Sequence, residues 1–287
     1  MTTDLQRFID CMEYRSSDRR PNHELGVWPQ TVVRWQEEAH GAIEGFTWNW
    51  FRGEDGLQLD LREYIPVHYG FIPPFEHTII EETEEYEVFR DGLGIVHKAL
   101  KAGTVGGGRM CMDQYLEHPV KTPADFPDIK RRLVAALPER YPADLDARVE
   151  TWERRECPLV LGVNCAANGF YWRAREFMGT EELSMAWYDY PDLMHEMMEF
   201  FADFIIETSR PVLERISVEY FTLNEDLAMT SGPLLSPATF RRFILPHLKR
   251  LVEFMKGNGV RYFAVDSDGD PTPLIPLMMD AGVDILW

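Results

Sequence analysis

Residues 260–270, with the sequence VRYFAVDSDGD, join a compact apolar stretch to three aspartates and a glycine. In the two-residue repeat of a β-strand, Tyr262, Ala264, Asp266 and Asp268 share one face. Two carboxyl groups this close cannot both ionise freely unless a cation, a basic substrate group or hydrogen bonds compensate the charge. The stretch therefore predicts a strand that carries a coupled pair of carboxyl groups at its end.

Helices are predicted on both sides of this strand. The serine–proline pair at 236–237 is a strong helix start, and the glycines at 257 and 259 end that helix just before the strand. A second helix is predicted from Thr272 to Gly282. Residues 283–287 then begin another strand. The strand at 260–266 is therefore one unit in a series of alternating strands and helices.

Four further strands are predicted upstream, at residues 23–28, 61–71, 158–164 and 218–223. The order strand, polar loop, helix, strand is typical of parallel sheets with crossover helices. Polar residues follow the strand ends, where a (β/α)₈ barrel and an open doubly wound sheet both place their active sites. Six strands fall short of the eight that a closed barrel needs. We therefore predict an α/β fold of the TIM-barrel type that is incomplete at its C-terminal end.

Residues 76–101, EHTIIEETEEYEVFRDGLGIVHKALK, alternate apolar and polar side chains around a turn at 90–92 and predict a β-meander. The glycine-rich GTVGGG at 103–108 lacks the GK[ST] of a P-loop, so a plain loop is favoured over a phosphate site. Helical patterns start near residue 122 and again after residue 169. We predict one domain over residues 1–287, with the meander as an insertion.

The composition narrows the classes of partner. The chain has 287 residues, 45% of them hydrophobic, which is enough for a large core. Its formal net charge of −19 predicts no nucleic-acid or membrane partner, because nucleic acids and anionic membranes are polyanions. No signal-like or membrane-spanning run occurs, and the four cysteines lack metal-binding spacing. These features predict a soluble, cytoplasmic protein with a small-molecule substrate and leave its oligomeric state open.

A second acidic cluster, Asn224-Glu225-Asp226, follows the preceding strand. By strand periodicity Glu225 faces one side, while Asp226 and the candidate substrate-binding residue Asn224 face the other. Because consecutive strands are usually neighbours, Glu225 or Asp226 is expected to lie near Asp266 and Asp268. This arrangement suits proton transfer, cation recognition, or a hard metal ion held by Asp266 and Asp268. A calcium loop of the EF-hand type is excluded, since positions 271 and 277 are proline and leucine.

Other residues are candidates for substrate binding. Glu24 and Trp28 lie near the end of the first predicted strand, and Asn164 ends the third. Arg173 and Arg175 follow Asn164 and would meet an anionic substrate, with a position on the helix surface as the alternative. The histidines in or near the meander have no HxH or HExxH spacing and predict no metal site: His68, His77, His97 and His118.

Several long runs carry a family resemblance. They are NEDLAMTSGPLLSPATFRRFILPHLKRLVEF at 224–254, VDSDGD at 265–270 and PLIPLMMDAGVDIL at 273–286. HELGVWPQTVVRW near the start and YLEHPVKTPADF in the middle add to it. Together these runs resemble the uroporphyrinogen decarboxylase superfamily, and specifically its decarboxylase-like members.

The resemblance implies a (β/α)₈ barrel with its site at the C-terminal face, and family strands that would lie beyond Trp287. It implies either a lyase of porphyrin biosynthesis, which decarboxylates uroporphyrinogen without a cofactor, or a zinc-dependent methyltransferase that works with corrinoid proteins. The decarboxylase has an arginine motif and a catalytic aspartate where this chain reads ELGVWPQ and YIPVHYGF. The methyltransferases carry His-x-Cys-Gly where this chain has Asp266-Ser267-Asp268-Gly269, and carboxylates favour harder cations than thiolates do.

These observations together predict an enzyme of this superfamily that acts on a tetrapyrrole, a corrinoid-borne methyl group or a related small molecule. Asp266 and Asp268 would bind the reacting group, or a divalent metal beside it, and Glu225 or Asp226 would act as acid or base. The departures from both motifs favour a divergent reaction. The alternatives are a corrinoid-dependent methyltransferase component and a non-catalytic protein that holds a corrinoid or another small molecule.

Overall fold

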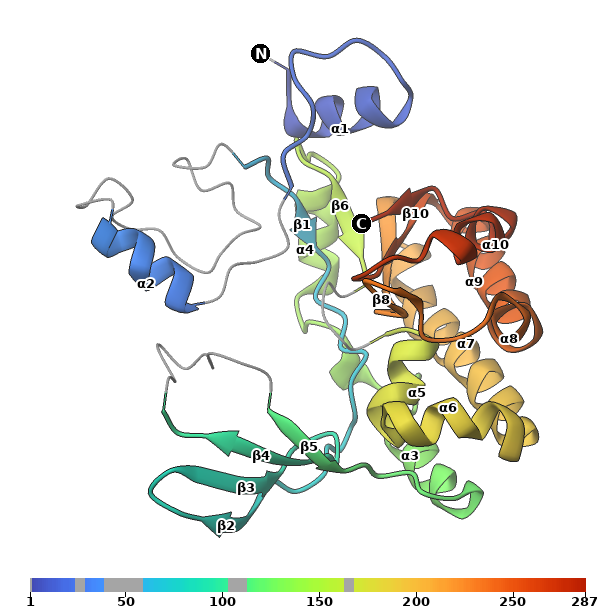
Figure 1. Cartoon of the computed structure of the whole chain (residues 1–287). Coiled ribbons are helices and arrows are strands. Elements are labelled where there is room, and N and C mark those ends of the chain that lie inside the picture. The colour runs from blue at the N-terminus through green and yellow to red at the C-terminus, as the bar shows by residue number, and fades with distance from the viewer. Residues whose placement is uncertain (1, 24–28, 39–58, 103–112, 163–167) are drawn as a thin grey trace.

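The computed structural model describes residues 2–23, 29–38, 59–102, 113–162 and 168–287 (Figure 1). A parallel sheet of five strands lies at its centre, in the spatial order β1-β6-β7-β10-β11. These strands are β1 (Glu63–Tyr64), β6 (Leu159–Leu161), β7 (Val218–Asn224), β10 (Val260–Asp266) and β11 (Ile285–Leu286). The described residues therefore form a mixed α/β fold, as the alternating pattern predicted.

The longest strand pairing joins β7 to β10. Their register runs from Val260 opposite Val218 to Asp266 opposite Asn224, so the two acidic clusters leave the sheet at the same edge. All seven residues of β7 are buried. A strand that is buried along its whole length is typical of a parallel sheet covered on both faces.

One face of the sheet packs against a layer of helices. Phe221 and Leu223 of β7 and Phe263 and Val265 of β10 lie in this core. The helices that follow β6 in the chain are α5 (Tyr171–Met178), α6 (Thr180–Asp189), α7 (Pro191–Leu213), α8 (Pro237–Thr239), the π-helical turn η5 (Phe240–Ile244), α9 (Leu245–Gly257), the 3₁₀ turn η6 (Thr272–Leu274) and α10 (Ile275–Ala281). The predicted helices at 236–256 and 272–282 are confirmed within this layer.

The opposite face packs against the N-terminal helix α1 (Asp4–Met12). The Phe8 ring lies 5.4 Å from the ring of Tyr220 and 6.0 Å from the ring of Tyr262. The hydroxyl of Thr3 accepts a hydrogen bond from the backbone N–H of Gln6 and caps the helix. A further helix, α2, spans Pro29–Glu38.

The meander forms a second, antiparallel sheet. Its strands are β2 (Thr78–Glu82), β3 (Tyr86–Arg90), β4 (Val96–Leu100) and β5 (Gln114–Glu117), paired in that order. Figure 1 shows this sheet as a separate lobe beside the parallel sheet. The predicted meander at 76–101 contains β2, β3 and β4, and β5 adds a fourth strand; that the meander is an insertion into one domain stays a prediction. The chain then continues through η3 (Pro123–Asp125), α3 (Phe126–Arg132), η4 (Pro138–Arg140) and α4 (Leu145–Trp152).

The predicted strand at 61–71 is largely wrong, because only β1 pairs with the sheet. Pro66 has no N–H to donate to a neighbouring strand. Further along, the carbonyls of His68 and Gly70 accept hydrogen bonds from the buried Arg140 guanidinium at 2.6 and 2.9 Å. The segment therefore satisfies its backbone with a side chain in place of a sheet partner.

Three further predictions concern the first strand, the glycine-rich loop and the closure of the barrel. The strand predicted at 23–28 and the glycine-rich loop at 103–108 lie outside it, apart from His23. Within it, β1 and β11 are the edges of the parallel sheet, so the five strands do not close into a barrel. None of the helices described is both long enough and apolar enough to span a bilayer.

Candidate active site

The two acidic clusters meet where β7 and β10 end. The backbone N–H of Glu225 donates to the carbonyl of Asp266 at 2.9 Å, which continues the pairing of the strands by one residue. The backbone N–H of Asp268 donates to Oδ1 of Asp226 at 3.2 Å. The structure therefore brings Asp226, Asp266 and Asp268 together, as the strand order predicted.

Backbone strain is concentrated at the same point. Asp226 has φ of 40°, a left-handed conformation that few residues other than glycine adopt. Such strain persists only where the surroundings enforce it, and it occurs frequently at functional sites. Here the left-handed turn lets the Asp226 carboxylate accept the N–H of Asp268.

A short hairpin holds the aspartate loop in place. It consists of β8 (Ala228–Met229) and β9 (Gly232–Pro233), and the N–H of Asp270 donates to the Met229 carbonyl at 2.9 Å. Gly269 has φ of 80°, and a Cβ atom there would lie 2.6 Å from the Ala228 carbonyl. Only glycine fits this approach, so the glycine of VDSDGD serves to dock the loop.

The electrostatics differ among the aspartates. Asp266 is partly buried, and burial together with the charges of Asp226 and Asp268 raises its pKa to about 6. Burial also raises the pKa of Asp226, against the opposing effects of the Asp268 N–H and the Arg175 guanidinium. Asp268 itself is exposed. Asp266, at the last position of β10, therefore carries a carboxyl group that titrates near neutral pH.

Glu225 points away from this cluster, toward the helix layer. Its carboxylate accepts the backbone N–H groups of Phe170, Tyr171 and Trp172 at 2.9, 2.7 and 3.3 Å. Burial nevertheless raises the pKa of Glu225 to about 7. The predicted division of faces between Glu225 and Asp226 is confirmed, and the geometry gives Glu225 a position as the cap of α5. A role for it as acid or base stays a prediction.

The two candidate arginines of α5 lie in different surroundings. Arg173 is 2% exposed, pairs with Glu176 at 3.0 Å and donates to the Tyr69 carbonyl at 3.0 Å. These buried contacts do not agree with an open anion contact for Arg173. Arg175 lies over the Trp172 ring at 4.3 Å and donates to the Asp226 carbonyl at 3.3 Å. Of the two arginines, Arg175 is therefore the one that borders the acidic cluster.

Of the remaining candidates for substrate binding, only Asn224 lies among the described residues. Asn224 is buried at 6% exposure and pairs in register with Asp266, so it lies at the site. Glu24, Trp28 and Asn164 lie outside the described residues. Sequence reasoning missed the left-handed Asp226 and the contact between Arg175 and Trp172. The spacing of aromatic and arginine residues in YWRAR, just after a strand, was the available signal for the second.

Part of the sequence matches a known protein family. Residues 173–287 match the model of the uroporphyrinogen decarboxylase (URO-D) family. This part of the chain is therefore similar to the uroporphyrinogen decarboxylase family. The match includes β7, β10 and both acidic clusters, so the candidate site lies within the URO-D segment.

A comparison of folds finds a solved structure with a similar chain path. The solved structure of a methyltransferase from Methanosarcina mazei superposes with a TM-score of 0.54. The alignment covers 100% of this chain and 76% of that chain, at 15% sequence identity. At this identity the likeness shows a shared fold alone. No curated protein matches the sequence.

The side chains at this position can be compared with the ligands that hold zinc in the superfamily's methyltransferases. At the URO-D position where those enzymes carry histidine and cysteine, this chain carries Asp266 and Asp268, and Asp268 points into solvent. Among the residues described, no group of three or more His, Cys, Asp or Glu side chains is arranged to hold a metal ion. The donor set therefore does not fit a zinc–thiolate centre of that kind.

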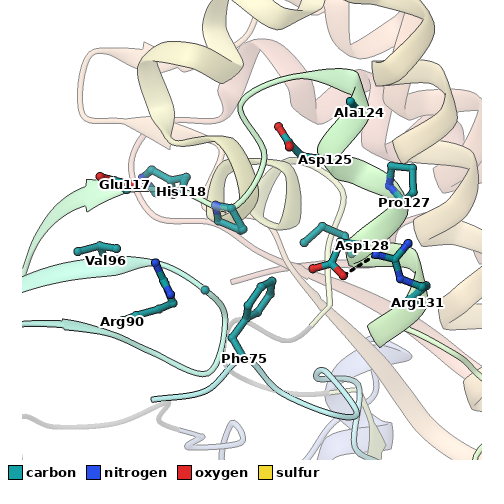
Figure 2. Close-up of a pocket in the computed structure, with 13 residues that line it drawn as sticks. Phe75, Arg90, Val96, Glu117, His118, Ala124, Asp125, Pro127, Asp128 and Arg131 are labelled. Carbon is teal, nitrogen blue, oxygen red and sulfur yellow. Dashed lines mark hydrogen bonds and ion pairs between the residues drawn. The ribbon is translucent and has the colours of Figure 1, made fainter. Parts of the chain in front are cut away.

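Two cavities lie near the meander. The smaller cavity, of about 360 Å³, lies between the meander and α3. Figure 2 shows Phe75 and Arg90 on one side of it, and Asp128 paired with Arg131 at 2.8 Å on the other. The larger, of about 1130 Å³, lies between the meander and the helices α5 and α6. Asp226, Asp266 and Asp268 line neither cavity. The larger one comes close to them through Arg175.

Proposed function

We propose that this URO-D protein is an enzyme that transfers protons to a tetrapyrrole or corrinoid-related small molecule at the carboxyl ends of β7 and β10. The observation that carries the proposal is the coupled set of Asp226, Asp266 and Asp268, in which the pKa of Asp266 is raised to about 6. Perturbed carboxyl groups at strand ends are typical of acid–base sites. A group with this pKa is present in both protonation states near neutral pH, so it can donate and accept a proton.

Decarboxylation is the reaction that this arrangement supports best. In that reaction the bond between the substrate carbon and its carboxylate breaks, and the electron pair stays on the carbon while carbon dioxide leaves. Protonated Asp266 would deliver its proton to that carbon and become a carboxylate. Asp226, held by the Asp268 N–H at 3.2 Å, would keep the pKa of Asp266 high and favour the protonated form before the reaction. This chemistry requires no cofactor.

Methyl transfer from a corrinoid is the second candidate. It is favoured by the structural likeness to a methyltransferase. Asp266 and Asp268 would then contact a cation or the methyl acceptor directly, in place of the thiolate and imidazole ligands that are missing here. A corrinoid protein would be the partner in this case.

Turnover assays with two substrate classes test the proposal. Uroporphyrinogen is incubated with the protein and the products are separated after oxidation; methylcobalamin with a thiol is followed by the loss of its methyl–cobalt absorbance. We expect decarboxylation, reduced about 10²- to 10⁴-fold in Asp266→Asn. Asp280→Asn, in which an exposed carboxylate that pairs with Lys249 is replaced, is the matched control.

The pH profile sharpens the same test. Because the pKa of Asp266 is raised to about 6, kcat/KM should fall as the pH rises through this value and the proton donor is lost. Wild-type turnover in Asp266→Asn would refute the assigned role. Methyl transfer without decarboxylation would replace the first candidate by the second.

A further inference from the structure

The larger cavity has two walls of different origin. The meander contributes His97, Tyr115 and His118, and α5 contributes Trp172 and Arg175. Its volume of about 1130 Å³ is slightly above the roughly 300–1,000 Å³ that small-molecule sites occupy. The cavity therefore has room for a ligand of cofactor size together with water.

The meander wall belongs to a continuous row of rings that crosses β3, β4 and β5, with one ring just before β2 and one just after β5. Neighbouring ring centroids are 5.2, 5.1, 5.0 and 6.1 Å apart along the row His77, Phe89, His97, Tyr115 and His118. Phe89 and His97 are nearly parallel, at 4°. Such cross-strand stacking fixes ring positions, and Tyr115 is still 46% exposed. The last three rings of the row, His97, Tyr115 and His118, line the cavity.

The end of this row is held against the α5–α6 junction. Nδ1 of His118 lies 2.8 Å from the Glu176 carbonyl, to which it donates a hydrogen bond. Gly179, with φ of 82°, leaves space for the imidazole, since a Cβ atom there would lie 2.8 Å from the His118 ring. The two walls of the cavity are therefore fixed relative to each other at this end.

Most of the carboxylates that line the cavity already have cationic or imidazole partners. Asp91 lies 3.0 Å from His97, Glu117 lies 3.0 Å from Lys121, and Glu176 lies 3.0 Å from Arg173. Glu181 and Glu182 are exposed in the first turn of α6. Lys121 and Arg173 therefore offset the charge of two of the carboxylates that line the cavity.

Arg175 is different from these paired groups. Within the described ranges no carboxylate forms an ion pair with it; its contacts are the Trp172 ring at 4.3 Å and the Asp226 carbonyl at 3.3 Å. A guanidinium that stacks on an indole is held flat and keeps its outward N–H groups for a planar, bidentate anion. The α5 wall therefore offers an aromatic face and an anion-binding group side by side.

We propose that this cavity binds a planar aromatic ligand that carries a carboxylate, with the ring between Tyr115 and Trp172 and the carboxylate on Arg175. The aromatic faces supply the contact area and Arg175 supplies the charge-assisted hydrogen bonds. Because Arg175 also contacts the Asp226 backbone, a bound ligand lies beside the acidic cluster without occupying it. The inference does not rest on the proposed reaction.

Binding of 2-naphthoate, a planar aromatic carboxylate, tests the proposal by isothermal titration calorimetry on the full chain. We expect Arg175→Gln to weaken its Kd about tenfold or more, as for loss of a charged hydrogen bond, and Tyr115→Ala to weaken it about threefold or more, as for loss of an aromatic pair. Arg175→Lys should retain part of the affinity, and 2-naphthylmethylamine should bind more weakly than 2-naphthoate. Arg148→Gln and Tyr188→Ala, at exposed residues outside the cavity, are the controls.

Thermal unfolding of each variant shows whether it remains folded before its Kd is interpreted. If 2-naphthoate does not bind at millimolar concentration, or binds equally to Arg175→Gln, Tyr115→Ala and the controls, the proposal is wrong. Tighter binding of the amine than of the carboxylate overturns it as well. Binding that depends on Arg175 in a protein without uroporphyrinogen turnover upholds this inference and contradicts only the proposed reaction.

Discussion

Asp266 occupies the last position of β10, with Asp226 on the neighbouring strand and Asp268 two residues further along its own chain. Burial and the two neighbouring charges act in the same direction on its carboxyl group, so its pKa rises to about 6. Asp268 shares the periodicity of Asp266 but lies past the strand end, where it is exposed. The two carboxyl groups therefore differ in their exposure to solvent.

Replacing Asp266 should change how stability depends on pH. Its raised pKa means that the folded state holds the proton more tightly than the unfolded state, so this stabilisation is present below pH 4 and is lost as the pH rises through 6. Asparagine has no proton to lose. Asp266→Asn should therefore be more stable than wild type at pH 8 by about 1 kcal/mol after allowance for solvent screening.

Urea unfolding at pH 5.5 and at pH 8 measures this difference, with Asp280→Asn as the control. The gain from Asp266→Asn should be larger at the higher pH. A variant that is less stable than wild type at pH 8 would contradict the prediction and would indicate that a cation or donor holds Asp266 as a carboxylate.

At the scale of elements, the end of β7 and the start of α5 form one unit. The Glu225 carboxylate accepts three backbone N–H groups at the helix N-terminus, which would otherwise be buried without partners. A negative charge at this end also suits the helix dipole. Because α5 carries Arg175 and Trp172, this cap sets where the α5 wall of the larger cavity lies.

Removal of the cap should be costly. Glu225→Ala leaves buried N–H donors without an acceptor, and the free energy of unfolding should fall by about 3 kcal/mol. Glu225→Gln keeps an acceptor oxygen and should lose less. Urea denaturation measures both, with Glu253→Ala on the exposed surface of α9 as the control. Equal stability of Glu225→Ala and wild type would show that other groups satisfy the start of α5.

At the scale of the whole molecule, a buried parallel sheet lies between α1 on one face and the α7–α9 layer on the other, beside the antiparallel lobe (Figure 1). The formal net charge of −19 is spread over this structure. Like charges on one molecule repel each other and oppose the compact state. Local ion pairs such as Arg7 with Asp60 offset part of this repulsion near the N-terminus.

Salt should therefore stabilise the protein. Raising NaCl from 20 to 200 mM screens the repulsion between exposed carboxylates and should increase stability by about 1 kcal/mol, or roughly 3 °C in Tm. Differential scanning calorimetry at constant pH measures the shift in Tm. The same buffer with 20 mM NaCl is the reference. A Tm that falls with salt would mean that ion pairs outweigh the net repulsion.

The regular elements around the site could be predicted because their signals are local. The serine–proline start at 236–237, the glycines after the helix and the apolar strand at 260–266 each depend on neighbours in the chain, and the structure confirms them. Strand periodicity also separated Glu225 from Asp226 correctly. The segment at 61–71 failed because its carbonyls are satisfied by Arg140, about 70 residues away in the chain.

The sequence by itself determined the alternating α/β order, the position of the acidic clusters at two strand ends and the resemblance to the URO-D superfamily, which the match over residues 173–287 supports. Only the tertiary structure decided that Arg173 is buried against Glu176, that Arg175 borders the Asp226 loop, and that the meander forms a cavity with α5 and α6. The physical reason is the distance along the chain over which each kind of interaction acts. Helix caps and strand periodicity depend on residues a few positions apart, whereas burial, pKa shifts and cavities depend on which distant segments pack together.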